Sequence, residues 1–278
     1  MEPKTYRLLA LDLDGTLLNS QKELSPRNRR ALEKAHEKGV LIVPTTGRFY
    51  GGMPQVIREL PFVRYCVTIN GAQVMDLWKN KVLYRAEIPC AQAVEIMSWL
   101  DGYPALYDCY QQNESFMTAR LREKAMETIE DIHFRNMVRD LRQPVPELKA
   151  FLLERGRDLQ KIQFFIQDQP LRRWLMEELP RRFADLSVTS SVRENVEINH
   201  KDAHKGAALT ALAKYLGFGK EAVIAFGDGE NDISMLREAG LGVAMENACP
   251  QALAAADYIT ASCDEDGVAQ AMEKFILN

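Results

Sequence analysis

The sequence predicts an α/β protein in which both ends of the chain form a parallel-sheet core and an α+β domain is inserted between them. Three observations lead to this prediction. Short apolar runs alternate with amphipathic segments near both ends of the 278 residues, which is typical of a parallel sheet flanked by helices. Two of these runs, Tyr6–Leu11 and Ala222–Phe226, are followed closely by carboxylates. The alternation is lost from roughly residue 88 to residue 190.

The first part of the chain predicts strands and helices in turn. After the strand Tyr6–Leu11, a helix begins at Ser25-Pro26, an N-cap residue followed by an N1 proline, and Gly39 ends it. The next expected elements are a strand over Val40–Pro44, a helix near 52–60, a strand over Tyr65–Ile69, and a hairpin of Ala72–Asp76 and Lys81–Arg85 around Lys79-Asn80.

The middle block predicts the order helix, two strands, helices, strand, helix, strand, and Gln160–Ile166 is its clearest strand. Alternation resumes with a helix over Lys205–Leu216, which Gly217 ends. The remaining expected elements are strand Ala222–Phe226, helix Ile233–Glu238, strand Leu241–Ala244, a helix near Pro250–Ala256, strand Asp257–Thr260 and a helix near Gly267–Ile276. These elements predict a core domain of residues 1–86 and 191–278 and an inserted domain of residues 87–190.

Composition narrows the classes of function. The net charge of −4 argues against a general nucleic-acid or membrane surface, and no apolar stretch reaches membrane-spanning length. The segment Met1–Thr5 lacks the basic start of a leader peptide. The five cysteines are scattered and odd in number, which favours reduced thiols in a cytoplasmic protein. We expect a monomer or a small homo-oligomer.

Carboxylates follow two of the expected parallel strands. Asp12 and Asp14 end the first strand, and Asp228 follows the later one, with Asp232 one helical turn further on. Because the carboxyl ends of parallel strands meet at one edge of a sheet, we expect these four side chains to meet there. Taken alone, each aspartate could cap a helix or end a turn, and Asp232 fits such a cap.

Four crowded carboxylates need positive charge nearby. A magnesium ion prefers such hard oxygen ligands, and Arg48 and Lys205 are further candidates. The segment Thr46-Gly47-Arg48 also follows a strand, and it offers a hydroxyl and free backbone N–H groups that suit a phosphate.

These motifs resemble those of haloacid dehalogenase-like hydrolases. In chain order they are Asp12-Leu13-Asp14-Gly15-Thr16, Thr45-Thr46-Gly47-Arg48, Asn70-Gly71-Ala72, Lys205-Gly206 and Gly227-Asp228-Gly229-Glu230-Asn231-Asp232. Their spacing is similar to that of the Cof-type sugar-phosphatase-like subfamily. The resemblance implies a Rossmann-like core with an inserted α+β cap of type IIB. It also implies Mg²⁺-dependent hydrolysis of small phosphorylated metabolites, either sugar phosphates or phosphorylated cofactors.

The resemblance further implies a role for each matched residue. Asp12 would attack phosphorus and form an aspartyl phosphate, and Asp14 would act as general acid and then as general base. Magnesium would be held by the Asp12 and Asp228 carboxylates, the Asp14 carbonyl, Gly229 and, through water, Asp232. The phosphoryl oxygens would be bound by Thr46, the backbone N–H groups of Leu13 and Gly47, Lys205 and Asn231. Arg48 would reach the substrate or brace the acidic cluster.

Two other functions stay open at this point. A phosphomutase uses the same pair of aspartates, and a non-catalytic phosphometabolite-binding regulator could keep the fold, although it would not need Asp14. Selection of the leaving group is a separate question. A polar, aromatic stretch of the inserted domain, Tyr107, Tyr110, Gln111 and Asn113, is our hypothesis for that role.

Overall fold

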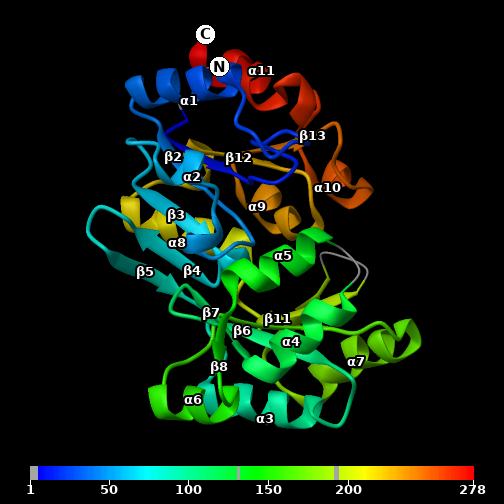
Figure 1. Cartoon of the computed structure of the whole chain (residues 1–278). Coiled ribbons are helices and arrows are strands. Elements are labelled where there is room, and N and C mark those ends of the chain that lie inside the picture. Colours follow the sequence, from blue (N-terminus) through cyan, green and yellow to red (C-terminus); the bar gives the residue numbers. More distant parts are fainter. Residues whose placement is uncertain (1–5, 130–131, 191–193) are drawn as a thin grey trace. The chain divides into compact units, whose positions relative to one another are not determined.

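A computed structural model describes residues 6–129, 132–190 and 194–278 (Figure 1). The segment Met1–Thr5, on which the expectation about a leader peptide rests, lies outside the described residues. The chain forms two compact units. The first, here the core unit, consists of Met1–Arg48, Met53–Arg85 and Ala203–Asn278; the second, here the inserted unit, consists of Phe49–Gly52 and Ala86–Asp202.

The core unit combines short helices with two sheets. Its strands are β1 (Leu8–Leu11), β2 (Leu41–Pro44), β3 (Tyr65–Thr68), β4 (Gln73–Asp76), β5 (Lys81–Arg85), β12 (Val223–Gly227), β13 (Leu241–Met245) and β14 (Tyr258–Thr260). Its helices are α1 (Pro26–Glu37), α2 (Gln55–Arg58), α8 (Lys205–Leu216), α9 (Ile233–Glu238), α10 (Pro250–Ala255) and α11 (Gly267–Met272).

The central sheet of this unit is parallel, in the order β14-β13-β12-β1-β2. Leu8 and Ala10 of β1 pack in the apolar cluster that includes α8, and their neighbours Leu9 and Leu11 alternate to the other face, where they are equally buried. Burial on both faces explains the continuous apolar run. Helices α1 and α11, from opposite ends of the sequence, lie side by side (Figure 1), joined by a hydrogen bond from the Ala269 N–H to Asn28 Oδ1 (3.0 Å).

Local signals set the limits of the helices. The Ser25 side chain accepts a hydrogen bond from the Asn28 N–H (3.0 Å), and Pro26 opens α1 as predicted. Gly217 ends α8 in the left-handed conformation, with a φ of 75°. Helix α8 matters for the site because its first residue is Lys205.

The inserted unit is an α+β layer structure. Its sheet has the order β10-β11-β9-β6-β7-β8. The strands are β6 (Leu106–Gln111), β7 (Glu114–Thr118), β8 (Gln143–Val145), β9 (Lys161–Phe165), β10 (Leu186–Thr189) and β11 (Asn195–His200). The helices are α3 (Cys90–Leu100), α4 (Ala119–Thr128), α5 (Ile132–Leu141), α6 (Leu148–Arg155) and α7 (Gln169–Arg182).

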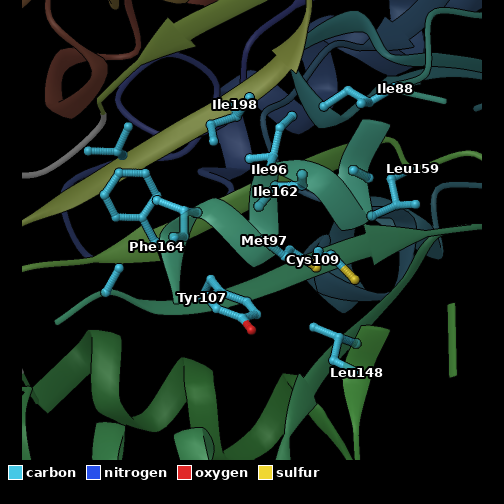
Figure 2. Packing of buried hydrophobic residues seen from close by; sticks show 14 of the residues in the cluster. Ile88, Ile96, Met97, Tyr107, Cys109, Leu148, Leu159, Ile162, Phe164 and Ile198 are labelled. Atoms are coloured by element: carbon cyan, nitrogen blue, oxygen red, sulfur yellow. The ribbon is translucent and has the colours of Figure 1, made fainter. Parts of the chain in front are cut away.

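One face of the six-stranded sheet of the inserted unit is apolar. Tyr107 and Cys109 of β6 pack there with Phe164 of β9 and Met97 of α3 (Figure 2). The opposite face carries charged and amide side chains, among them Asp108, which alternates with Tyr107 and Cys109 along β6. The predicted fold class, a parallel α/β core with an inserted α+β part, is confirmed.

Several elements differ from the expectations. Strand β11 pairs with β9, so residues 195–202 lie in the inserted unit, whereas the sequence analysis assigned residues from 191 onward to the core. Strand β8 was not predicted, because Pro144 interrupts its short segment. The helix expected near 52–60 is only the turn Tyr50–Gly52 and the single-turn helix α2. Among the described residues, no helix is long and apolar enough to cross a membrane.

Candidate active site

The carboxyl end of β1 holds Asp12, which is only 6% exposed. Its backbone N–H donates to the Phe226 carbonyl of β12 (3.0 Å), so pairing of the two parallel strands fixes its position. Asp12 Oδ1 accepts a hydrogen bond from Lys205 Nζ (2.6 Å). The same fully buried ammonium donates to Asp232 Oδ1 (2.6 Å). One lysine therefore joins carboxylates from both ends of the chain.

The loop after β12 interlocks with the loop after β1. Thr16 Oγ1 donates to Asp228 Oδ1 (2.7 Å). Asp232 Oδ2 accepts the backbone N–H groups of Asp228 (2.9 Å) and Gly229 (2.8 Å). A Cβ atom on Gly15 would lie 2.5 Å from Asp228 Oδ2, and the φ of this residue is +88°, so glycine is required at the close approach.

The charges of this cluster do not balance. Asp12, Asp228 and Asp232 contribute three negative charges against the single positive charge of Lys205, a formal excess of −2 (one minus three). Burial raises the pKa of Asp12 well above its usual range, the Lys205 ammonium opposes this, and the neighbouring carboxylates raise that pKa further. Burial also raises the pKa of Asp228. Burial alone would lower the pKa of Lys205, but its ion pairs raise that pKa above the usual value.

The donor set fits a divalent cation. Oxygen atoms of Asp12, Asp228 and Asp232 lie within 4.8 Å of one another. They are hard ligands of the kind that Mg²⁺ prefers, and a doubly charged ion would neutralise the excess. The Asp14 side chain is not one of the three, and Gly229 has only backbone atoms to offer. Only the backbone carbonyl of Asp14 is then left for a metal at this cluster, which is the ligand that the family resemblance implies.

Asp14 is held by two cations. Two guanidinium nitrogens of Arg48 donate to the Asp14 carboxylate, Nε to Oδ2 (2.7 Å) and Nη2 to Oδ1 (2.8 Å). Lys22 Nζ lies 3.1 Å from Oδ1. Burial raises the pKa of Asp14, but Arg48 and then Lys22 outweigh it and hold that pKa below its usual value. The bidentate contact makes Arg48 a brace of the acidic group in this structure.

The residues expected to bind a phosphoryl group lie at neighbouring loops. Thr46 is buried after β2, and its Oγ1 accepts the Arg48 N–H (3.2 Å). Asn231 donates from Nδ2 to Asn70 Oδ1 (3.1 Å), and the same Asn70 oxygen would lie 2.7 Å from a Cβ atom on Gly47. The structure therefore brings Thr46, Gly47 and Asn231 around Asn70. Leu13 lies between Asp12 and Asp14, with a fully buried side chain.

No role was predicted for Thr16 or Asn70, which were quoted only as parts of motifs. A hydroxyl and a carboxamide in the loops that follow β1 and β3 were the available signal, but the partners of Thr16 and Asn70 are distant in sequence.

The leaving-group hypothesis needs correction. Tyr107 and Gln111 lie on the face of β6 opposite to Tyr110, because side chains alternate along a strand. The Tyr107 ring packs in the apolar cluster (Figure 2), and its hydroxyl donates to Asp101 Oδ1 (2.7 Å). Gln111 Nε2 donates to the Arg157 carbonyl (2.7 Å). Tyr107 and Gln111 therefore do not share one side of β6 with Tyr110, so the hypothesis does not hold for these residues as a group.

A buried lysine at the start of α8, beside carboxylates from the ends of parallel strands, suits an α/β enzyme that handles phosphoryl groups with a cation. The sequence matches the model of the haloacid dehalogenase-like hydrolase family over residues 9–272, and the chain belongs to that family. The family predicted from the motifs is thus confirmed. The acidic cluster agrees with the metal dependence of this family.

Known relatives agree with this assignment. The Bacillus subtilis 5-amino-6-(5-phospho-D-ribitylamino)uracil phosphatase YcsE is 33% identical over 280 residues, covering 99% of this chain and 98% of its own. A haloacid dehalogenase-like hydrolase from Bacteroides thetaiotaomicron superimposes with a TM-score of 0.83 at 29% identity, covering 97% of this chain and 99% of its own. The subclass IIB sugar phosphatase BT4131, 24% identical, shares the fold with a TM-score of 0.82, covering 98% of this chain and all of its own. The chain is an enzyme, a haloacid dehalogenase-like hydrolase of the phosphatase type.

Proposed function

We propose that this enzyme is a magnesium-dependent phosphatase that hydrolyses small phosphorylated metabolites through an aspartyl-phosphate intermediate. The observation that supports this most directly is the buried Lys205 ammonium between Asp12 and Asp232, beside Asp228. A cluster with this excess of negative charge is costly unless a cation and a reaction use it.

The reaction has two halves. A carboxylate oxygen of Asp12 attacks phosphorus, the ester P–O bond breaks, and the leaving oxygen takes a proton from Asp14. Asp14 then removes a proton from water, the resulting nucleophile attacks the aspartyl phosphate, and the bond between Asp12 and phosphorus breaks. Inorganic phosphate leaves and both aspartates return to their starting state.

The metal would be held by the Asp12 and Asp228 carboxylates and the Asp14 carbonyl, with Gly229 and a water on Asp232 completing the set. When bound, Mg²⁺ supplies positive charge against the phosphoryl oxygens. The chain's own groups around those oxygens would be Thr46, Lys205, Asn231 and the backbone N–H groups of Leu13 and Gly47. Arg48 and Lys22 stabilise the carboxylate form of Asp14, which the second half needs. The first half needs its protonated form, so these contacts have to loosen when substrate binds.

The substrate belongs to the finer part of the proposal. The relative YcsE is named as a phosphatase of 5-amino-6-(5-phospho-D-ribitylamino)uracil, a phosphate ester of a sugar-alcohol chain. This compound is therefore the first to test, together with hexose phosphates, nucleotides and phosphorylated cofactors.

The experiment measures phosphate release from this panel with Mg²⁺, with a chelator, and with Asp12→Asn. We expect metal-dependent release that Asp12→Asn removes while the fold is retained. Asp140→Asn, a matched change at an exposed carboxylate of α5, should behave like the parent. Formation of an isomeric phosphate would instead identify a mutase. Near-parental hydrolysis by Asp12→Asn would rule out the covalent mechanism.

A further inference from the structure

The motif Asn70-Gly71-Ala72 has no part in the proposed reaction, yet the backbone there is unusual. The turn after β3 has three consecutive positive φ angles: 52° at Ile69, 56° at Asn70 and 99° at Gly71. Left-handed backbone is costly for a β-branched residue such as isoleucine. Strain of this kind persists only where the surroundings hold it, and it gathers at functional sites.

Backbone hydrogen bonds tie this turn to the expected phosphate loop. The Ile69 N–H donates to the Arg48 carbonyl (3.0 Å), and the Asn70 N–H donates to the Thr46 carbonyl (3.1 Å). Gly71 approaches the start of α8 so closely that a Cβ atom would lie 2.4 Å from the His204 carbonyl carbon. The turn thus contacts both the segment Thr46–Arg48 and the residue that precedes Lys205.

The strained conformation delivers the Asn70 side chain between two predicted phosphate ligands. Its Oδ1 accepts a hydrogen bond from Asn231 Nδ2 (3.1 Å). A Cβ atom on Gly47 would lie 2.7 Å from the same oxygen, so the carboxamide packs directly on the Gly47 backbone. The Asn231 amide has two N–H donors. With one of them on Asn70, its plane is fixed and the second is oriented for another acceptor.

We propose that Asn70 is the positioning residue of the phosphoryl site: it holds the Asn231 carboxamide and the Gly47 peptide in the orientation that receives phosphate. This inference rests on the proposed function, because Asn231 and Gly47 are phosphate ligands only within it. It accounts for a costly turn at a position that no catalytic step requires.

The chain contains a matched control. Asn80, in the turn between β4 and β5, is also left-handed, with a φ of 47°, but it is exposed and far in sequence from these loops. Asn70→Gly and Asn80→Gly both keep the backbone N–H and relieve strain. Only Asn70→Gly removes a carboxamide from Asn231.

The experiment is calorimetric titration of inorganic phosphate into the Mg²⁺-loaded full-length protein, with thermal melting of each variant. We expect Asn70→Gly to weaken phosphate binding by about five- to tenfold, the value of one neutral hydrogen bond. Its melting temperature should be equal to that of the parent or higher, and Asn80→Gly should bind phosphate like the parent. In a double-mutant cycle, Asn70→Gly should add little to Asn231→Ala, because Asn70 acts through Asn231.

The outcomes separate the two proposals. If the parent protein binds no phosphate and hydrolyses no ester, the proposed function fails and the inference fails with it. If the parent binds phosphate and Asn70→Gly binds it equally well, only the inference fails. Full additivity with Asn231→Ala, or a loss that follows a lowered melting temperature, would likewise overturn the positioning role.

Discussion

Both units of this enzyme bury charged side chains, but only one of them balances the charges. In the core unit, Asp12, Asp228 and Asp232 surround Lys205 and leave a formal excess of −2. In the inserted unit, Asp108 and Glu197 are matched by Arg142 and Lys161, so the formal charge is zero (two minus two). Each side chain of the second group is less than a tenth exposed.

The balanced group is held by contacts among β6, β9, β11 and Arg142, which lies between α5 and β8. Arg142 donates from Nε to Asp108 Oδ2 (3.2 Å) and from Nη2 to the Tyr110 hydroxyl (2.8 Å). Lys161 Nζ lies 2.7 Å from Glu197 Oε2. Burial raises the pKa of Asp108 even with Arg142 beside it, whereas the paired acids raise the pKa of Arg142 and of Lys161 despite burial.

The two buried groups of charges have different requirements. Burying charges is costly in both units, and a complete set of partners within the protein offsets that cost. In the inserted unit each of these buried charges has an opposite charge within the protein, although among the described residues Asp108 Oδ1 accepts and Arg142 Nη1 donates no hydrogen bond. The group in the core unit lacks positive charge, so a cation from solution is the partner that would complete it.

The largest expected effect comes from removing the core cation. Lys205→Met leaves Asp12, Asp228 and Asp232 without a positive neighbour, and we expect turnover to fall on the order of 10³-fold or more. Added Mg²⁺ should raise the melting temperature of this variant more than that of the parent, because the excess of negative charge has grown. Steady-state kinetics and melting with and without Mg²⁺ test this.

Arg142→Met is the control for that comparison, since it removes a buried cation from the balanced group. Its melting temperature should fall, but the rise caused by Mg²⁺ should equal that of the parent. An equal Mg²⁺ response of Lys205→Met and Arg142→Met would contradict the distinction between the two groups.

The next effect concerns stability in the inserted unit. Asp108→Asn leaves the Arg142 guanidinium buried beside a neutral amide, and we expect the free energy of unfolding to fall by about 3–5 kcal/mol. The double change Asp108→Leu with Arg142→Met removes both charges and should recover most of that loss. Urea denaturation of the two variants measures the difference, and a double variant less stable than Asp108→Asn would show that the pair contributes net stability.

The smallest effect on stability is expected at the ion pair of Arg64 with Asp76, which belongs to neither of the two buried groups of charges. Hydrogen bonds from Arg64 (Nη2 to Oδ2, 2.8 Å) hold the pKa of Asp76 below its ordinary 3.8. A lowered folded pKa gives stability above pH 3.8 that is lost as the pH falls through the folded value. Asp76→Asn should cost about 1–3 kcal/mol at pH 7. Denaturation between pH 7 and pH 2.5 should show the difference in free energy of unfolding between the parent and Asp76→Asn shrinking as the pH falls. A difference that stays constant over this range would exclude a contribution from the lowered pKa of Asp76.

The parallel core could be predicted because its signals are local. Strand β1 is an apolar run that is followed by Asp12, and Gly217 follows the last residue of α8 directly. The meeting of Asp12 with Asp228 followed from the rule that parallel strands share an edge. A cation was expected near the acids. Lys205, buried between Asp12 and Asp232, is such a cation.

The features that the sequence did not predict depend on contacts between residues distant in sequence. The alternation of Val196, Glu197 and Ile198 was a signal for β11, but its pairing with β9 decides to which unit it belongs. Nothing local indicates that Arg142, just beyond α5, pairs with Asp108 on β6. Isoleucine favours strands, but the backbone at Ile69 is left-handed. Hydrogen bonds from the Ile69 N–H to Arg48 and from the Asn70 N–H to Thr46 override that preference.

The order of strands in the central sheet also constrains how the protein is made. Strand β1 lies between β2 and β12, and β12 emerges from the ribosome only after the whole of residues 86–202. Closing so long a loop is slow, whereas contacts within the inserted unit are nearer in sequence. We therefore expect the inserted unit to fold during synthesis while β1 still lacks one neighbour. The nascent chain would have no complete acidic cluster, and therefore no activity, until β12 and the loop that follows it have been made.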